Sequence, residues 1–456
     1  MNIEINGLGV VKNAKIDLAK KLIVFTGLNS TGKTYVSYLI YALTSRQRLI
    51  PAPLADEDMA ALLDAKSLRY SIEENKICSY RRELVASVTS NLHEIFGISK
   101  EQSATLFKSF SVAFQSSDKD FIGKVRSESF EAQLIGNDFK ITGVKDADSM
   151  DVMLTIDYEG TLSQRSLDVI RYAVLPNIHA SLALHPIPRS VIFPVERNSI
   201  YTFSKELSLK RTLLVDEMQN LNTKTFDPVD FFNKRSTRYP QPIRDGLEVA
   251  EDLTNLKKQN SPFLDFATEL EEELLQGKVS VSSDGEVQFA SDKAKSKKLP
   301  IHLTASIVKT LSSLVFYLKH LAMKGDLIII DEPELNLHPD NQVVLARIFS
   351  RLINAGFRII LSTHSDYIIR ELNNLIMLSS DKPSVNELRE RYGYRDNERI
   401  SPEDVGAYFF DFKSKTTVTA LPLPVAENGF SVPSIDRTIE KINAVSEDLY
   451  FALTQE

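Results

Sequence analysis

The sequence has almost no cysteine and lacks any long apolar run. Cys78 is the only cysteine among 456 residues, so the chain cannot form an internal disulfide or a cysteine-based metal cluster. No uninterrupted apolar stretch is long enough to cross a bilayer, and the N-terminus lacks the basic and then apolar layout of a signal peptide. These absences predict a cytoplasmic protein without a membrane anchor.

An excess of positive charge is also missing. The net charge is −7 and the isoelectric point is near 5.7. A generally basic, nucleic-acid-coating protein is therefore excluded, although a local basic surface remains open. Sustained heptads, internal repeats and low-complexity tracts are absent, which excludes a long coiled coil. What is present, 43% hydrophobic and 25% charged residues, is typical of a globular protein with a large core.

The clearest motif is "GLNSTGKT", which runs from Gly27 to Thr34 and fits the pattern G-x-x-x-x-G-K-[ST]. A short apolar run precedes it and apolar residues at helical spacing follow it, which is the strand, loop and helix context of a phosphate-binding loop. Backbone N–H groups of such a loop point at phosphate oxygens, and the helix N-terminus adds partial positive charge. Lys33 is expected to reach the β- and γ-phosphates, and the Thr34 hydroxyl to bind Mg²⁺. The other loop residues expected to bind ATP are Gly27, Asn29, Ser30, Thr31 and Gly32. The alternative is a chance glycine-rich turn, which is rare when the flanking pattern is also required.

Two adjacent acids end a second apolar run, in "LIIIDEPELNLHP". Residues 327–330 read as a buried parallel strand, whose carboxyl end lies where ligands bind in open α/β sheets. Asp331 is expected to hold Mg²⁺, and Glu332 to orient or polarise the water that attacks the γ-phosphate. The alternative is a solvated strand end before a proline turn, which the presence of the phosphate-binding loop makes less probable.

A histidine stands at the end of a third apolar run, "RIILSTHS". The chain order is strand, acidic pair, helix, strand and polar tip, and this order places His364 at the same edge of the sheet. We expect His364 to sense the γ-phosphate, with a purely structural histidine as the alternative.

Together these three motifs, in this order, resemble those of ABC-type ATPases, within the soluble SMC-like and OLD-like branch. The strand-rich start "IEINGLGVVKNAKIDL" is similar to the opening hairpin of that branch. The resemblance implies an α/β P-loop head with a mostly parallel sheet flanked by helices, an N-terminal antiparallel sheet and helical insertions. It also implies that two heads close around two ATP molecules. Lys33 and Thr34 would be the Walker A pair, Asp331 and Glu332 the Walker B pair, and His364 the switch histidine.

The resemblance implies two further elements, and both depart from the usual pattern. In "HLTASIVKTLSSLVF", Ser306 stands at the serine of the signature motif, but Ile307 occupies the place of its glycine. The alternative is that Thr304 is simply a helix N-cap. In "SVIFPVERNSI", the sequence resembles the PxER version of OLD-like defence ATPases. Arg197 is expected to contact phosphate or a neighbouring acid, with a surface salt bridge as the alternative.

The long interval between the two halves of the site must contain insertions. The expected segments are 1–50 with 130–204 as the N-terminal part of the head, 51–129 and 205–276 as helical insertions, and 277–456 as the C-terminal part. "DFKITGV" and "DVMLTIDYEG" alternate like strands of a second small sheet, and Asp284-Gly285 is expected to form a hairpin turn. An amphipathic helix is expected near the C-terminus.

The function predicted from these residues is that of an ATPase using ATP and Mg²⁺, forming a dimer or higher oligomer around nucleotide. By resemblance to the AriA-type and PtuA-type subunits of PARIS and Septu, it is expected to regulate a separate effector in anti-phage defence, such as a TOPRIM-like or HNH nuclease. The chain itself lacks the acidic or histidine motifs of a nuclease. DNA or a phage protein remains a possible partner; Arg235, Arg238 and Tyr239 are the first choices for DNA contact. The alternatives are a RecF-like ATPase that clamps DNA directly and a scaffold that binds ATP but hydrolyses it slowly.

Overall fold

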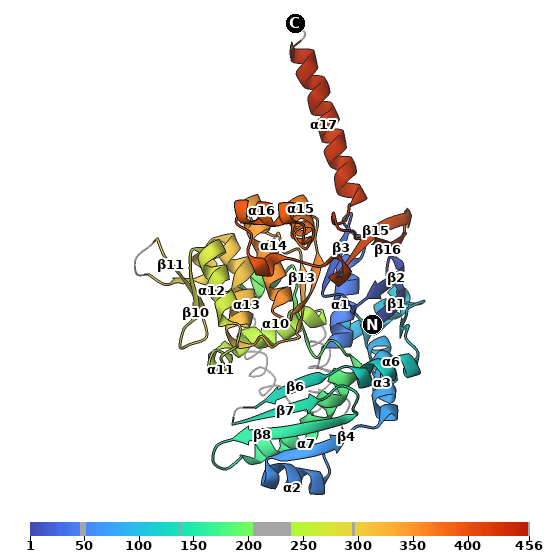
Figure 1. The fold of residues 1–456 in the computed structure, drawn as a ribbon, viewed down its shortest axis with the longest axis vertical. Helices are drawn as coiled ribbons and strands as arrows, with labels where there is room; N and C mark the ends of the chain where they lie inside the picture. Colours follow the sequence, from blue (N-terminus) through green and yellow to red (C-terminus); the bar gives the residue numbers. More distant parts are fainter. Residues whose placement is uncertain (46–51, 137, 204–238, 294–296, 455–456) are drawn as a thin grey trace, which may run out of the picture.

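The structure is a computed structural model that describes residues 1–45, 52–136, 138–203, 239–293 and 297–454. The described part contains a large mixed sheet with helices on both faces and two smaller sheets. One of the smaller sheets lies at the bottom of the view in Figure 1, and a long C-terminal helix leaves the body at the top.

Nine strands of the described chain form the large sheet. Their spatial order is β5 (Ser111–Phe114), β1 (Asn2–Leu8), β2 (Val11–Asp17), β16 (Thr417–Leu423), β15 (Val405–Ser414), β3 (Leu22–Gly27), β14 (Arg358–Ser362), β13 (Leu327–Asp331) and β9 (Ser190–Phe193). From β15 to β9 each neighbouring pair is parallel, whereas β1 pairs antiparallel with β2 and β5. This arrangement confirms the predicted α/β class with N-terminal antiparallel strands.

The large sheet separates two apolar cores, because successive strand residues point to opposite faces. Every residue of β3 and β13 is buried, as expected for central parallel strands. Ile23 and Phe25 belong to the core that contains α1 (Lys33–Thr44), whereas Leu22 and Val24 belong to the other core. The helices of the second core are α13 (Ser306–His320), α14 (Pro339–Asn354) and α15 (Asp366–Met377). Because β3, β14 and β13 are parallel neighbours, their carboxyl ends lie at the same edge of the sheet.

A second sheet in the described chain has four antiparallel strands. Their order is β4 (Ser67–Ser71), β8 (Asp151–Tyr158), β7 (Phe139–Lys145) and β6 (Phe130–Ile135). Both strands expected from the alternation at 138–144 and 151–160 are present as β7 and β8. The helices around this sheet and beside the opening strands are α2 (Asp56–Ala65), α3 (Glu74–Ser90), α4 (Leu92–Phe96), α5 (Lys100–Leu106), α6 (Asp118–Ser127) and α7 (Gln164–Ala183).

The expectation that residues 51–129 are a helical insertion needs correction at two places. This segment also contains β4, which is an edge strand of the four-stranded sheet, and β5, which is an edge strand of the large sheet. The sequence did not reveal them because β4 has five residues and β5 has four, and an alternation this short is not distinctive. The boundaries of the expected segments otherwise remain predictions.

The third described sheet follows a run of helices. It consists of β10 (Gly277–Val281), β11 (Val287–Ser291) and β12 (Leu299–Pro300). The β10–β11 hairpin turns at Asp284-Gly285 as predicted, and Gly285 has a φ of 81° there. Of the predicted helical insertion 205–276, residues 204–238 lie outside the described chain. The remainder contains α10 (Gln241–Glu251), α11 (Leu253–Leu256), α12 (Leu264–Leu270) and the π-helical turn η2 (Glu271–Leu275).

The last described elements complete the sheet and then leave it. They are the 3-10 turn η3 (Ile301–Leu303) before α13, then α16 (Pro383–Arg391), the turns η4 (Asp396–Glu398) and η5 (Pro402–Asp404), the strands β15 and β16, and α17 (Pro433–Thr454). The helix α17 is the expected amphipathic helix near the C-terminus, and Figure 1 shows it projecting from the body. No helix of the described residues is both long and apolar enough to span a membrane.

Candidate nucleotide-binding site

The loop between β3 and α1 has the backbone shape of a phosphate-binding loop. Gly27, Ser30 and Gly32 adopt positive φ angles of 133°, 62° and 85°. A Cβ at Gly27 would lie 2.4 Å from the carbonyl oxygen of Phe410, and one at Gly32 would lie 2.6 Å from a methyl group of Val11. Both positions therefore require glycine, for conformation and for space. The loop curls tightly between β15 and β2.

The Lys33 side chain lies inside this loop. Its ammonium donates hydrogen bonds to the carbonyl oxygens of Gly27 and Leu28, at 3.1 and 2.9 Å. The side chain is 6% exposed, and burial lowers the pKa of Lys33 to about 8, although the nearby acids oppose that shift. The cation is thus held by the carbonyls of its own loop, at the position from which it would reach a phosphate.

The remaining loop residues differ in exposure. Asn29 and Ser30 are exposed, whereas Thr31 is buried and its hydroxyl donates to the carbonyl of Leu28 at 2.8 Å. The Thr31 side chain therefore stabilises the loop itself. Binding of ATP by Asn29 and Ser30 remains a prediction.

Thr34 and Asp331 join the two halves of the predicted site. The Thr34 hydroxyl donates to Oδ2 of Asp331 at 2.7 Å, although the residues are 297 positions apart. Asp331 is fully buried, and its Oδ1 has no hydrogen-bond partner among the described residues. A buried, unpaired carboxylate oxygen beside a hydroxyl is a donor set that suits Mg²⁺. The residues present therefore fit the cation that the sequence predicts.

Glu332 follows Asp331 in an unusual backbone conformation. Its φ is 48°, which is rare for a residue with a side chain and is typical of functional sites. Its N–H donates to the carbonyl of Ser362 at 2.8 Å, and this contact with β14 holds the residue in place. Burial and the neighbouring Asp331 carboxylate raise the pKa of Glu332, while Lys33 opposes the rise. A carboxylate with a raised pKa is a better proton acceptor.

The structure overturns one of the two expectations for Arg197, the surface salt bridge, while contact with phosphate remains a prediction. The side chain is 3% exposed, so it makes no surface salt bridge. Its guanidinium donates to three backbone carbonyls instead, those of Pro194 (3.0 Å), Asp331 (2.6 Å) and Glu332 (2.7 Å). Burial lowers the pKa of Arg197 to about 10, so it stays charged near neutral pH. Arg197 therefore contacts the neighbouring acids through their backbone carbonyls rather than their carboxylates, and so holds the backbone of the acidic pair in place.

His364 lies at the end of β14, half-buried beside the acidic pair. Burial, with a smaller contribution from the Lys33 charge, lowers the pKa of His364 to about 4. The imidazole is therefore neutral at pH 7 and offers a hydrogen bond rather than a charge.

Glu334 is a residue of this site that the sequence analysis missed. Its Oε1 accepts a hydrogen bond from the backbone N–H of His364 at 2.7 Å. Its Oε2 is buried and has no partner among the described residues, and burial raises the pKa of this carboxyl. The available signal was the third acid in "DEPE", two residues beyond the predicted pair. Glu334 ties the tip of β14 to the turn after β13.

Ser306 lies at the start of α13 and is exposed, as expected for a residue at a helix beginning. The alternative that Thr304 caps this helix is wrong, because the N-cap is Ala305 and Thr304 donates its hydroxyl to the carbonyl of Ile301 at 2.6 Å. Ile307 is helical and partly buried against the second core. The structure describes one chain, so contact of Ser306 with a second nucleotide remains a prediction.

The residues predicted to contact DNA are only partly described. Arg235 and Arg238 lie outside the described residues. Tyr239 is 39% exposed just before α10. Its role in DNA contact remains a prediction.

Comparison with models of protein families shows which family this chain belongs to. A model described as an AAA ATPase domain matches residues 1–369. The chain belongs to this AAA ATPase family. The matched span of the AAA ATPase includes the phosphate-binding loop, the acidic pair, Glu334 and His364. The family supports the predicted binding of a nucleotide.

Solved structures similar to this AAA ATPase include three SMC heads. An SMC head bound to the C-winged helix domain of ScpA shares 12% identity at a TM-score of 0.36, covering 93% of this chain and 98% of that chain. A Smc head with an extended coiled coil, from Pyrococcus furiosus, shares 12% identity at a TM-score of 0.34, covering 97% and 98%. The SMC head domain from Thermotoga maritima shares 9% identity at a TM-score of 0.29, covering 92% and 98%. Comparison with curated proteins gives no match.

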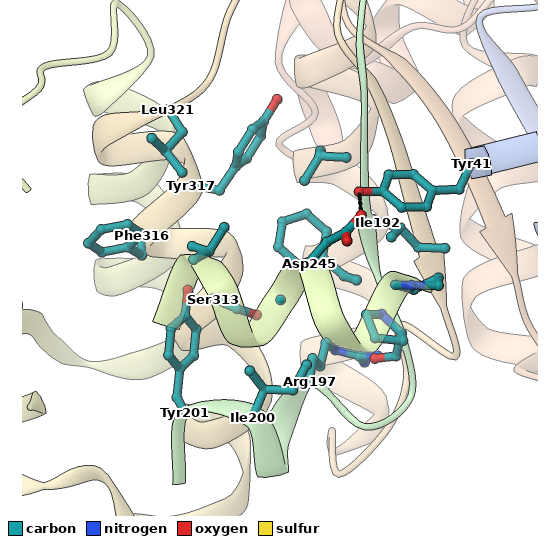
Figure 2. A pocket seen from close by; sticks show the side chains of 16 residues that line it. Tyr41, Ile192, Arg197, Ile200, Tyr201, Asp245, Ser313, Phe316, Tyr317 and Leu321 are labelled. Carbon is teal, nitrogen blue, oxygen red and sulfur yellow. Dashed lines mark hydrogen bonds between the residues drawn. The ribbon is translucent and has the colours of Figure 1, made fainter. Parts of the chain in front are cut away.

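A cavity of about 90 Å³ lies beside Arg197 in this AAA ATPase (Figure 2). Its lining is mainly apolar and comes from β9, α10 and α13; Tyr41 of α1 donates a hydrogen bond to Asp245 at 2.6 Å. Neither Lys33 nor Glu332 is among the described residues that line this cavity. The cavity therefore adjoins the residue that holds the acidic pair, and it is separate from the phosphate-binding loop.

Proposed function

We propose that this protein is an ABC-type ATPase that binds ATP with Mg²⁺ and hydrolyses it. The observation that carries the proposal is the hydrogen bond between Thr34 and Asp331, which brings the phosphate-binding loop and the acidic pair to one edge of the sheet. A glycine loop, a buried lysine and two acids at the end of a parallel strand form the set of groups that phosphoryl transfer to water needs.

Each residue in this proposal has a task that its surroundings favour. Lys33 pairs with the β- and γ-phosphates in place of the carbonyls that it now contacts. Thr34 and Asp331 hold Mg²⁺, which when bound polarises the phosphates and neutralises developing charge. Glu332 accepts the proton of the attacking water, and its raised pKa supports that task. His364, neutral at pH 7, donates a hydrogen bond toward the γ-phosphate.

Steady-state release of phosphate from ATP tests this proposal. Glu332→Gln should retain ATP binding but lose turnover, because an amide can hold the water but cannot accept its proton. The matched control is Glu427→Gln, which makes the same change at an exposed position outside the site. Equal turnover in all three proteins would remove Glu332 from the role of base.

We further propose that two copies close face to face around ATP, with Ser306 of one copy near the γ-phosphate bound by the other. Its exposure at the start of α13 supports this. Ser306→Arg should leave monomer ATP binding intact but block ATP-dependent association in the Glu332→Gln background, because a bulky cation would sit in the closing interface. If Ser306→Arg associates like its parent, this contact is not made.

A second function, a scaffold that binds ATP and hydrolyses it slowly, is favoured by Ile307. This side chain is partly buried against the second core, where the ABC signature motif has glycine. Its backbone is helical, so isoleucine at this position has no strain from a positive φ. Ile307→Gly should therefore loosen the helix start by ~1 kcal/mol. Faster ATP hydrolysis by Ile307→Gly would support the function as a slowly hydrolysing scaffold. Fast ATP hydrolysis by the unaltered protein would contradict it.

The biological role that we propose is regulation of a separate effector, such as a TOPRIM-like or HNH nuclease, in anti-phage defence. It rests on the resemblance of "PVER" to the PxER segment of OLD-like defence ATPases. Phage plating on cells that carry this gene with and without its neighbouring genes tests it. Protection that needs both a neighbouring gene and Lys33 supports the role; no protection with the intact locus contradicts it.

A further inference from the structure

The C-terminal helix α17 is a surface that the described body does not cover. It runs for 22 residues, Pro433–Thr454, and none of these residues is buried. Figure 1 shows it projecting from the body with the C-terminus at its far end. Only its beginning touches the body, where Ile435 packs against the second core. Six large apolar side chains farther along are 50–82% exposed: Ile442, Val445, Leu449, Tyr450, Phe451 and Leu453.

The exposed apolar side chains of α17 leave it without the packing that stabilises most helices. In proteins most helical stability comes from packing of an apolar face. Clustered exposed apolar side chains mark an interaction site more often than scattered ones do. The spacing and charge of the residues on α17 indicate what this face can bind.

The isoleucines and leucines of α17 follow a heptad pattern, whereas Val445, Tyr450 and Phe451 lie beside it. Successive isoleucine and leucine positions are four, three, seven and four residues apart, and Ser446 occupies the heptad position between Ile442 and Leu449. These positions, the a and d positions of a coiled coil, are Ile435, Ile439, Ile442, Ser446, Leu449 and Leu453. The pattern spans about three heptads, which is too short for the coiled coil of an SMC protein but long enough for a helix pair.

The residues beside this face allow contact with a second copy. Of the flanking e and g positions only Asp436 is charged; the others are Thr438, Asn443, Val445, Tyr450 and Ala452. The remaining charges of the described helix lie on its outer side, at Arg437, Glu440, Lys441, Glu447 and Asp448. Charges at e and g positions set partner choice in coiled coils. Their near absence means that one copy of α17 does not repel another.

Charge favours an antiparallel pair. The first half of α17 is neutral, because Asp436 and Glu440 balance Arg437 and Lys441, whereas the second half has only acids, Glu447 and Asp448. A parallel pair would place the acidic halves side by side, and an antiparallel pair places each acidic half beside a neutral one. In the antiparallel register the a position of one helix meets the d position of the other, so Ile439 lies opposite Leu449.

The area that such a pair would bury is sufficient. Fully burying a Val, Leu or Ile side chain removes roughly 60–120 Å² from water. Five such side chains lie on this face beyond Ile435, and together with Tyr450 they amount to about 500 Å² on each helix. The pair would then bury about 1,000 Å² in total, which is the minimum expected of a biological interface.

We propose that α17 forms an antiparallel two-helix coiled coil with α17 of a second copy, and that this contact joins two ATPase units without nucleotide. A two-fold axis between the helices makes the contact self-complementary and closed. The proposal goes beyond the proposed function, in which ATP drives a different contact between the heads.

Light scattering of the full chain after size-exclusion chromatography, without nucleotide and over a range of protein concentrations, tests the proposal. The unaltered protein should be a dimer. Ile442→Lys with Leu449→Lys should shift it to the mass of one chain. The matched control is Glu440→Gln with Glu447→Gln, which changes the net charge equally but on the outer side, and should remain dimeric. A monomeric unaltered protein, or a dimer that persists in the double-lysine variant, overturns the proposal.

Cysteine crosslinking tests the orientation. In a Cys78→Ala background, Ile439→Cys combined with Leu449→Cys should form a disulfide between two chains, whereas Ile439→Cys alone should not. Crosslinking by Ile439→Cys alone would show a parallel pair and overturn the antiparallel assignment. The double-lysine change in a Glu332→Gln background should still associate when ATP is added, so failure of the α17 contact is distinguishable from failure of the ATP-driven one.

Discussion

Replacing Arg197 by methionine should weaken both the fold around the acidic pair and the turnover of ATP. Methionine fills much of the same buried space but donates no hydrogen bond. The variant leaves the carbonyls of Asp331 and Glu332 without the donor that now lies 2.6 and 2.7 Å away. Since Glu332 has a strained backbone with a φ of 48°, it should relax when this donor is removed.

The size of the stability loss follows from opposing contributions. Three hydrogen bonds from a charged donor contribute about 1.5–3 kcal/mol each. Removing a buried cation returns part of that, about 3 kcal/mol, because burial, opposed in part by the nearby acids, lowers the pKa of Arg197 to about 10. A net loss of about 1.5–6 kcal/mol remains. Urea unfolding followed by circular dichroism measures it, since the chain has no tryptophan to serve as a fluorescent probe.

The effect on turnover should exceed the effect on binding. A displacement of Glu332 by about 1 Å costs on the order of 100-fold in rate, whereas Lys33 and Thr34 still bind ATP. Arg351→Met is the matched control, because Arg351 is another buried arginine, 2% exposed, and it pairs with Glu398 away from the site. That control should lose stability but keep its turnover per folded molecule. If Arg197→Met hydrolyses ATP at the unaltered rate while folded, the positioning role is refuted.

Substitutions at four other positions of the site should each have a different effect. Lys33→Ala should lower ATP affinity by ~30-fold or more, because the loop loses its cation, as isothermal titration would measure. Glu332→Gln should slow single-cycle hydrolysis by ~100-fold or more without loss of binding. Glu334→Ala should lower kcat more than affinity, and Glu334→Gln, which keeps an acceptor for the His364 N–H, should restore much of it; equal loss in both would contradict a positioning role. The pKa of His364 is about 4 in the fold and near 6.5 when unfolded, so the unfolded chain binds more protons between these values and stability should rise with pH from about 4 to about 6.5. In His364→Asn the free energy of unfolding should change less with pH over this range. The difference from the unaltered protein should be no more than about 2 kcal/mol, because the group is only half-buried. Unfolding measured at several pH values checks this.

The local parts of the site were predictable from the sequence. The phosphate-binding loop depends on neighbouring residues, because its glycines supply the turns, its lysine lies within the loop, and an apolar run before it makes the strand. The acidic pair was predictable for the same reason, since four apolar residues and two acids form one continuous pattern. General rules of α/β sheets then placed His364 at the same edge as the acidic pair.

The partners of Arg197 and Glu334 were decided only by the tertiary structure. Arg197 and Asp331 are 134 positions apart, and Glu334 and His364 are 30 apart. Both contacts end on backbone groups, carbonyls in one case and an N–H in the other. Every residue type except proline has the same two groups, so no sequence pattern indicates which of them a buried side chain will reach. The identity of the reactive residues was therefore local information, and the means of holding them in place was not.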